Sequence, residues 1–270
     1  MSAGESGHCI PRNKGLGEVT GMGKAMKDLK KGDWVVFGKK QSGTWSSGQI
    51  LEEKDMIKVD RESGPVNCQT TKVSSFTVYN MLFDFVDLQP GDWIVQNSTN
   101  SAVGQAVIML TTSPTFKRIS RVSESLGATH VMTYNDLEDK TISEQVKELT
   151  GGKDIQLLLN CVGGKATTQM LCLAGKNAHF VTYGAMAEEA LSFPPSVFNF
   201  NNITAQGFWQ MEWFKQKSQQ ESTQIIRELV KYMATGKFKE LNHEIVKING
   251  KISDQEATTI IRDAVSKVAH

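Results

Sequence analysis

Residues 93 to 208 alternate between short apolar runs and segments in which apolar residues recur at helical spacing. Segments of this second kind predict helices that begin near residues 101, 143 and 166. Apolar strands that alternate with helices are typical of a parallel sheet covered on both faces. The pattern therefore predicts an α/β fold with a doubly wound sheet. Its strands are predicted at 93–96, 130–133, 155–162, 178–183 and 202–208.

The segments on either side of this region follow different patterns. Residues 28–37 place a turn before a short apolar run, and residues 43–48 and 56–60 suggest further short strands, so the first part of the chain is predicted to be a small β module. Residues 76–85 carry large apolar side chains at helical spacing, as expected for a helix that packs against a core. Two more amphipathic helices are predicted at 221–234 and 254–268.

The corner around residue 97 carries the clearest chemical signal. A turn at 90–92 and a short apolar strand lead into a polar loop at 97–101, and a helix follows. A pyrophosphate placed there would meet free backbone amides and the positive end of the helix dipole. The usual three-glycine fingerprint is not present, since only Gly104 remains of it. From the pattern alone, an ordinary strand–loop–helix corner of any α/β domain stays open.

The connection after this helix is short. Only 22 residues separate Gly104 from Gly127, and they must hold the rest of one helix, a second strand and a second helix. A βαβ unit alone takes about 30 residues or more, and Pro114 breaks any continuous helix. The sequence therefore predicts that the sheet lacks a regular second strand between residues 112 and 124.

Three basic residues lie in the same connection. Lys117, Arg118 and Arg121 fall near the distance at which the second strand of a dinucleotide fold selects its cofactor. Positive charge there favours a 2′-phosphate over a bare hydroxyl group, and hence NADPH over NADH. A solvated basic loop is the alternative that stays open.

Composition and charge narrow the function classes. Thirty basic and 29 acidic residues leave a formal net charge of +1, so no overall field favours nucleic acid or an anionic membrane as partner. The four cysteines lack paired short spacing and the five histidines are scattered, so we expect neither a disulfide framework nor a zinc site. No apolar run reaches the roughly 20 residues of a membrane span. The first residues include an acid and no arginine before Arg12, which is atypical of a mitochondrial transit peptide.

Five short motifs follow one another along the chain, and together they resemble the mitochondrial trans-2-enoyl-thioester reductases. These enzymes form a zinc-free branch of the medium-chain dehydrogenase/reductases. The resemblance extends, with gaps, from about Asn13 to about Ala264, and the ordered series is far more specific than any single motif. The motifs are Leu88-Gln-Pro-Gly-Asp, the segment Gln96 to Gln105, Leu159-Asn-Cys-Val-Gly-Gly-Lys, Val181-Thr-Tyr-Gly-Ala-Met and Gly207-Phe-Trp.

The resemblance implies a Rossmann-like doubly wound parallel sheet plus a partial GroES-like β-barrel domain. It divides the chain into a substrate-side β domain at 1–75, an NADP-binding domain at 76–209, and C-terminal helices at 210–270 that return to the substrate side. It also implies NADPH as cofactor, an enoyl-CoA or enoyl-ACP thioester as substrate, a homodimer, and a place in fatty acid synthesis in the mitochondrial matrix. Compared with the family, we expect the chain to lack an N-terminal segment, part of the second-strand region and the C-terminal end.

The resemblance also carries a cofactor site onto this chain. Ala102 and Ala185 stand where the family has glycine, and Ser74 stands where it has asparagine. For Tyr183 and Trp209, a structural role as large residues at the sheet edge stays open. The predicted cofactor-binding residues are Ser74, Asn100, Ser101, Ala102, Val103, Arg118, Arg121, Tyr183, Gly184, Ala185, Met186, Phe208, Trp209 and Gln210.

The catalytic residue of the family has no counterpart here. In the family, hydride passes from the nicotinamide to Cβ of the enoyl thioester, and a tyrosine ahead of an Asn-Glu-Gly motif assists the proton transfer to Cα. That motif resembles Asn13-Lys14-Gly15 in this chain, and the four tyrosines, Tyr79, Tyr134, Tyr183 and Tyr232, align elsewhere. We therefore name no catalytic residue.

Three function classes stay open from the sequence. The first is an NADPH-dependent reductase of 2-enoyl thioesters, with turnover far below that of a full-length relative. The second is a non-catalytic isoform or paralogue that binds nucleotide or a partner. The third is an oxidoreductase similar to quinone reductases, which do without the tyrosine. Binding of NADPH is the observation that separates them first.

Overall fold

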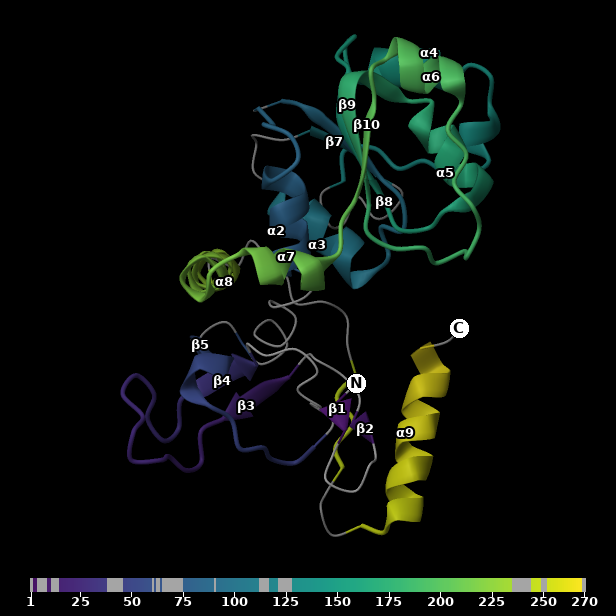
Figure 1. Ribbon diagram of the computed structural model, residues 1–270. Coiled ribbons are helices and arrows are strands. Elements are labelled where there is room, and N and C mark those ends of the chain that lie inside the picture. The colour runs from purple at the N-terminus through teal and green to yellow at the C-terminus, as the bar shows by residue number, and fades with distance from the viewer. Residues whose placement is uncertain are drawn as a thin grey trace.

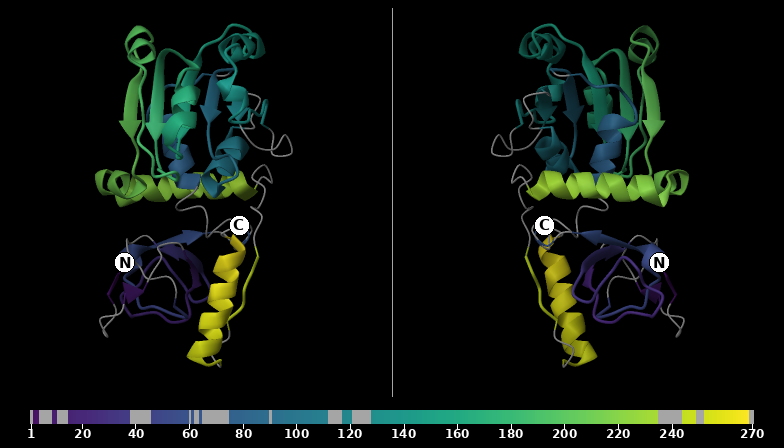
Figure 2. Two further views of the ribbon diagram at one scale, coloured as in Figure 1. Left: turned by 90° about the vertical axis from the view of Figure 1, so that its right-hand side faces the viewer. Right: turned by 90° about the vertical axis from the view of Figure 1, so that its left-hand side faces the viewer.

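A computed structural model gives two lobes, one built around a parallel sheet and the other around short antiparallel strands (Figure 1). Helices α7 (Gln210–Gln216) and α8 (Gln219–Ala234) run along the boundary between the lobes (Figures 1 and 2). The structure describes residues 2–3, 9–10, 15–37, 46–59, 61, 64, 75–89, 91–111, 117–120, 128–234, 244–248 and 252–268.

The upper lobe contains a five-stranded sheet whose neighbouring strands are all parallel. The predicted α/β class and the parallel sheet are therefore confirmed. The strand order is β10-β9-β8-β6-β7, and the strands are β6 (Trp93–Gln96), β7 (Lys117–Ser120), β8 (Ile155–Asn160), β9 (Ala174–Thr182) and β10 (Thr204–Gly207).

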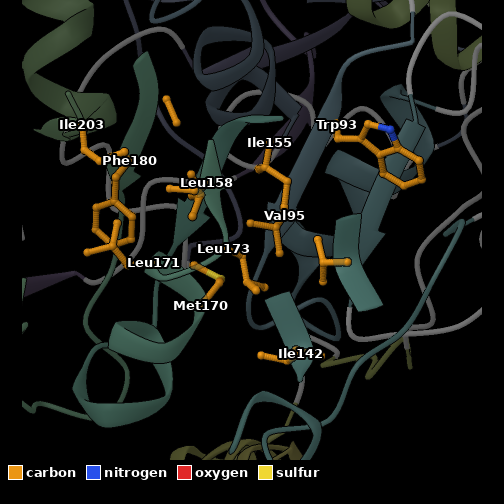
Figure 3. Packing of buried hydrophobic residues seen from close by; sticks show 13 residues of the cluster. Trp93, Val95, Ile142, Ile155, Leu158, Met170, Leu171, Leu173, Phe180 and Ile203 are labelled. Carbon is orange, nitrogen blue, oxygen red and sulfur yellow. The ribbon is translucent and has the colours of Figure 1, made fainter. Parts of the chain in front are cut away.

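Successive residues of β8 pack on opposite faces of the sheet, as strand geometry requires. Leu158 belongs to one core with Phe180 (Figure 3), while Leu157 and Leu159 belong to another with residues of two helices, α2 and α3. Both faces of the sheet are thus covered, which explains why β8 is apolar throughout. The helices of this lobe are α2 (Phe76–Phe83), α3 (Ala102–Leu110), α4 (Ile142–Leu149), α5 (Gly164–Leu171), α6 (Pro195–Phe200) and the short η5 (Asp136–Glu138).

The prediction that the sheet lacks a regular second strand is wrong. All four residues of β7 pair in parallel with β6, from Trp93 with Lys117 to Gln96 with Ser120. The length argument failed because the elements here are short: α3 has nine residues and β7 has four. Pro114 lies outside the described residues, between the end of α3 and β7.

The strand predicted at 130–133 is also wrong, since only His130 makes a β-bridge and residues 131–133 are not in a strand. The His130 ring stacks against Trp93 with ring centroids 6.0 Å apart, so this residue still packs beside β6. We infer that one bridge suffices because this segment adds ring packing rather than further ladder hydrogen bonds.

The lower lobe contains an antiparallel sheet in the order β3-β4-β5. These strands are β3 (Leu16–Glu18), β4 (Trp34–Phe37) and β5 (Met56–Val59), and a separate pair joins β1 (Ser2–Ala3) to β2 (Cys9–Ile10). The strands predicted within 28–37 and 56–60 are confirmed. Residues 46–48 of the strand suggested at 43–48 form a bend instead, and residues 43–45 lie outside the described residues. A short helix, η1 (Glu53–Asp55), precedes β5.

Helix α8 contacts both lobes. Ile226 and Leu229 of α8 are buried in one cluster with Val36 and Ile57 of the lower lobe and Phe76 of α2. Helix α9 (Asp254–Val268) lies beside the lower lobe (Figure 2). The predicted helices at 221–234 and 254–268 are both confirmed.

Candidate functional site

The loops that follow β6, β8, β9 and β10 lie at one edge of the sheet, because parallel strands present their carboxyl ends together. The chain leaves β6 toward β7 on one side and later returns to β8 on the other. Strand order reverses at this point, and ligands of open α/β sheets bind in the crevice at such a switch point.

The loop after β6 is held against the start of α3. Ser101 caps the helix, with its side-chain Oγ accepting a hydrogen bond from the Gly104 N–H at 3.0 Å. A Cβ atom at Gly104 would lie 2.6 Å from Thr99 Cα and would also strike the backbone oxygen of Ser98. Glycine is therefore required here for close approach of loop and helix, which explains why this one position of the fingerprint remains.

Two buried hydroxyl groups lie at this edge, that of Thr99, which is fully buried, and that of Tyr183, the first residue after β9. Thr99 Oγ1 has no hydrogen-bond partner among the described residues, whereas the Tyr183 hydroxyl lies near Ser101 and Cys161. Unsatisfied buried hydroxyls are costly in a native protein and call for an explanation such as a bound molecule. Both groups lie in segments that the sequence assigns to the cofactor site.

The loop after β9 folds back over the loop after β8. The N–H of Tyr183 donates to the Asn160 carbonyl oxygen at 2.8 Å, and the N–H of Met186 donates to the Cys161 carbonyl oxygen at 2.8 Å. A Cβ atom at Gly184 would lie 2.9 Å from the Cβ of Cys161, so the two loops are in close contact. The backbone of this loop is thus fixed by the neighbouring strand.

Tyr183 is held in its neutral form. Burial raises the pKa of Tyr183 well above its ordinary value, the nearby Cys161 raises this pKa further, and Ser101 opposes the rise. Because Tyr183 lies near Ser101, the loop after β9 lies against the loop after β6. A neutral phenol can donate a hydrogen bond to an acceptor in the crevice.

Met186 and Trp209 leave a large apolar surface exposed at the same edge, with exposed fractions of 76% and 66%. By contrast Phe208 is buried, with its N–H donating to the Thr182 carbonyl oxygen at 2.8 Å and its ring meeting Phe85 edge to face. Exposed apolar side chains beside a crevice are typical of a ligand-binding surface. Met186 and Trp209, which are both predicted cofactor-binding residues, are therefore accessible at this edge.

Gln210 connects the end of β10 to α2. Its side-chain oxygen accepts a hydrogen bond from the Thr77 hydroxyl at 2.9 Å, and both residues are buried. This contact fixes the start of α7 against the start of α2. Ser74, which precedes that helix and was predicted to bind cofactor, lies outside the described residues.

The structure brings together most of the predicted cofactor residues. Asn100 to Val103 form the loop after β6 and the first turn of α3, and Tyr183 to Met186 form the loop after β9. Arg118 lies in β7, and Arg121 falls directly after it, outside the described residues.

The register of β7 distinguishes the three basic residues. Lys117 pairs with Trp93 at the amino end of the strand, whereas Ser120 pairs with Gln96 at the carboxyl edge that carries the other loops. Three residues of strand separate the two ends by roughly 10 Å. Within β7, Lys117 therefore lies at the end farthest from this edge, and Arg121 lies outside the described residues.

Sequence reasoning missed the buried polar residues beneath the loops, above all Asn97, Asn160 and Thr167. Asn97 Nδ2 donates to Asn160 Oδ1 at 2.8 Å and thus joins the loops that follow β6 and β8. The sequence did carry a signal for two of them, because Asn97 directly follows a mostly apolar strand and Asn160 is the last residue of another.

The lower lobe holds a separate cavity of about 500 Å³. Its lining includes Leu16, Met26, Val35, Phe37 and Met56, and none of the predicted cofactor residues contributes to it. Among the described residues, no group of three or more His, Cys, Asp or Glu side chains is arranged to hold a metal ion. No helix in the described part of the chain is both long and apolar enough to cross a membrane.

Comparison with known proteins agrees with this geometry. The zinc-binding dehydrogenase family matches residues 98–231. Mitochondrial enoyl-[acyl-carrier-protein] reductases are similar in sequence: the Yarrowia lipolytica protein is 39% identical over 242 residues, covering 85% of this chain and 63% of that protein. The Xenopus tropicalis protein is 34% identical, covering 84% of this chain and 68% of that protein, and the human protein is 32% identical, covering 84% and 63%.

Solved structures show the same relation. An Etr1p complex with NADP and crotonyl-CoA is 28% identical, with a TM-score of 0.85 over 94% of this chain and 77% of that chain. The Etr1p/Etr2p heterodimer of Candida tropicalis, a mitochondrial 2-enoyl thioester reductase, is 28% identical with a TM-score of 0.84, covering 93% of this chain and 77% of that chain. The Escherichia coli quinone oxidoreductase shares the fold, with a TM-score of 0.70 at 20% identity over 83% of this chain and 70% of that chain. The chain thus spans about two thirds of the length of the curated relatives that it matches.

Proposed function

This chain belongs to the family of mitochondrial enoyl-[acyl-carrier-protein] reductases, and we propose that it binds NADPH and reduces trans-2-enoyl thioesters, either enoyl-CoA or enoyl-ACP. The observation that carries the proposal is the meeting of the loops after β6 and β9 around two buried hydroxyls, that of Thr99, which has no partner among the described residues, and that of Tyr183 beside Ser101. Support for the substrate comes from a similar structure that contains NADP and crotonyl-CoA.

The loop after β6 suits the diphosphate of a dinucleotide. The backbone amides at the start of α3 and the positive end of its dipole face an anion at that point. Gly104 keeps the loop against the helix, so a phosphate group can approach the backbone closely. Arg121 directly follows β7 in the sequence, and we propose that it pairs with a 2′-phosphate, which would favour NADPH over NADH.

The loop after β9 suits the nicotinamide end. Bound NADPH supplies a hydride for the substrate Cβ, and the role of the chain is orientation and exclusion of water. The exposed Met186 and Trp209 side chains would cover the nicotinamide and the acyl thioester. Tyr183 contributes a hydroxyl that stays protonated, and its nearest polar neighbours are Cys161 and Ser101.

Among the described residues the proton for Cα has no evident donor, and this observation favours a second candidate, a non-catalytic nucleotide-binding member of the family. Tyr79 packs against Phe83 on α2, Tyr134 is part of a turn, and Tyr183 is enclosed by the loops. The side chain of the fourth tyrosine, Tyr232, lies outside the described residues. Water is the remaining proton source if the chain turns over.

We further propose a homodimer built on the edge of the sheet at β10. All residues of β10 are exposed, and its outer side has no neighbouring strand among the described residues. Phe198 and Phe200 of the adjacent α6 are 42% and 76% exposed, which adds an apolar surface to this edge. An exposed strand edge flanked by aromatic residues is a template for pairing with a second chain.

The relatives are named as mitochondrial proteins, and we propose the mitochondrial matrix for this chain as well. We also keep the division into a substrate-side β domain at 1–75, an NADP-binding domain at 76–209 and C-terminal helices at 210–270 as a proposal.

The decisive experiment is a fluorescence titration with NADPH, followed by measurement of NADPH oxidation with a crotonyl or hexenoyl thioester. Binding together with thioester-dependent oxidation would support the reductase, and binding without oxidation would favour the non-catalytic member. Failure of a folded preparation to bind NADPH would refute both.

A further inference from the structure

A buried polar network lies beneath the candidate site, at the carboxyl ends of β6, β8 and β9. Its centre is Asn160, the last residue of β8, which is fully buried. Asn160 Oδ1 accepts hydrogen bonds from Asn97 Nδ2 at 2.8 Å and from Thr167 Oγ1 at 3.0 Å. The same oxygen faces the backbone N–H groups of Val162 at 3.0 Å and Gly163 at 3.2 Å.

The network reaches both the loop after β6 and the loop after β9. On one side, Asn97 begins the loop after β6, and its Oδ1 accepts from the Cys161 N–H at 2.9 Å. On the other side, Asn160 Nδ2 donates to Thr182 Oγ1 at 3.2 Å, directly before Tyr183. A single residue thus links the loop proposed to hold the diphosphate to the loop proposed to hold the nicotinamide.

Thr167 of α5 completes the network. Its hydroxyl oxygen accepts from Asn97 Nδ2 and from the Gly163 N–H, each at 3.1 Å. Its proton serves either Asn160 Oδ1 or the Gly163 carbonyl oxygen, at 3.0 and 2.8 Å. Thr167 is 1% exposed, so water does not replace these contacts. Buried polar groups are costly unless they are satisfied, and satisfied networks fix one geometry.

We propose that Asn97, Asn160 and Thr167 are positioning residues that set the distance between the loops after β6 and β9, and thereby hold both halves of the dinucleotide in one geometry. This inference rests on the proposed NADPH site. It assigns no contact with the cofactor to the three residues themselves. The Thr167 hydroxyl matters because it contacts both Asn97 Nδ2 and Asn160 Oδ1, so its loss removes two of the contacts that fix this pair, although their direct hydrogen bond remains.

The test compares Thr167→Val, which keeps shape and removes the hydroxyl, with Thr167→Ser, which restores it. Thr168→Val is the matched control on the same helix, since the Thr168 hydroxyl bonds to the carbonyl oxygens of Ser192 and Gly164 instead. Affinity is measured for NADPH and for adenosine 2′,5′-bisphosphate, which carries only the adenosine half. Thermal unfolding of each variant is recorded alongside.

We expect Thr167→Val to bind NADPH about tenfold more weakly, which corresponds to about 1.4 kcal/mol, while its affinity for adenosine 2′,5′-bisphosphate changes by less than about twofold. Thr167→Ser and Thr168→Val should match the unsubstituted chain for both ligands. If Thr167→Val does not fold, Thr182→Val breaks the link from Asn160 to the loop after β9, with the same expectation.

Two results would overturn the inference without refuting the proposed NADPH site. One is unchanged NADPH affinity in folded Thr167→Val, and the other is an equal loss for both ligands, which would indicate general loosening. If the unsubstituted chain binds no NADPH, the proposed function fails first and the inference fails with it.

Discussion

Gly104→Ala tests whether close approach of the loop after β6 to α3 is required. Two opposing effects decide the result. Alanine in place of glycine gains up to about 1 kcal/mol of helix propensity. Against this, the new Cβ would lie 2.6 Å from Thr99 Cα and 3.0 Å from the Thr99 carbonyl carbon. These atoms belong to the backbone, so relief requires the loop itself to move, and overpacking of this kind costs about 1–3 kcal/mol.

We therefore expect a net loss of stability from Gly104→Ala, together with weaker NADPH binding, because a displaced loop also loses the Ser101 cap. For a chain of this size, each 1 kcal/mol corresponds to roughly 2–4 °C in Tm. Urea unfolding and NADPH titration measure the two effects. Gly48→Ala is the control, since a Cβ there meets no atom within 4 Å. An increase in stability at Gly104→Ala, with NADPH affinity intact, would show that the loop is not held as described.

Four further outcomes are expected. NADPH should bind more tightly than NADH, and an Arg118→Ala/Arg121→Ala double variant should lose most of this difference, because a charge-assisted contact is worth about 1.5–3 kcal/mol. An unchanged preference for NADPH over NADH in that variant would exclude the basic segment from the site. Phe200→Glu should shift the chain toward monomer in sedimentation, whereas an unaltered dimer would exclude the β10 edge as the interface. The Asp33 carboxylate accepts a hydrogen bond from Lys58 Nζ at 2.7 Å, and this contact, more than any other, lowers the pKa of Asp33 below 3.8. This contact therefore stabilises the fold above pH 3.8, and its contribution is lost as the pH falls through the lowered pKa. Asp33→Asn should be less stable than the unsubstituted chain at neutral pH, and this difference in stability should vanish in acid unfolding experiments. Finally, the purified chain should reduce crotonyl thioester far more slowly than a relative that carries the family's tyrosine, because lack of a positioned acid costs about 10²–10⁴ in rate. Comparable rates in a parallel assay would contradict this.

The apolar pattern predicted well the strands that are covered on both faces, because burial on both faces requires an uninterrupted run of apolar residues. Strand β8 is an example, whereas helix α9 (Asp254–Val268), in which no described residue is buried, was predicted from its amphipathic spacing instead. Strand β7 left no such signal. Its sequence, Lys117-Arg-Ile-Ser, is mostly polar, and it pairs with β6 alone at the edge of the sheet. Backbone hydrogen bonds to an existing strand place it, and residue type contributes little to that choice.

The residues of the candidate site likewise fall into those that the sequence predicted and those that it did not. Ser101 and Gly104 were visible in the sequence because capping and close approach restrict residue type at single positions. The link from Asn97 through Asn160 to Thr182 joins three strand ends that lie far apart in the sequence. Each of these residues is unremarkable alone, and only the strand order places them together.

The presence of β7 changes how binding and catalysis relate in this chain. Strand β7 pairs with β6 at the position where dinucleotide folds select the adenosine half of the cofactor. The proton-transfer step does not depend on that strand, since the resemblance places the family's tyrosine ahead of its Asn-Glu-Gly motif and not in the second strand. Tyr183 does not replace it, because burial against Cys161 holds its proton tightly. NADPH affinity and turnover should therefore vary independently, so a variant that strengthens nucleotide binding would not restore the rate of thioester reduction.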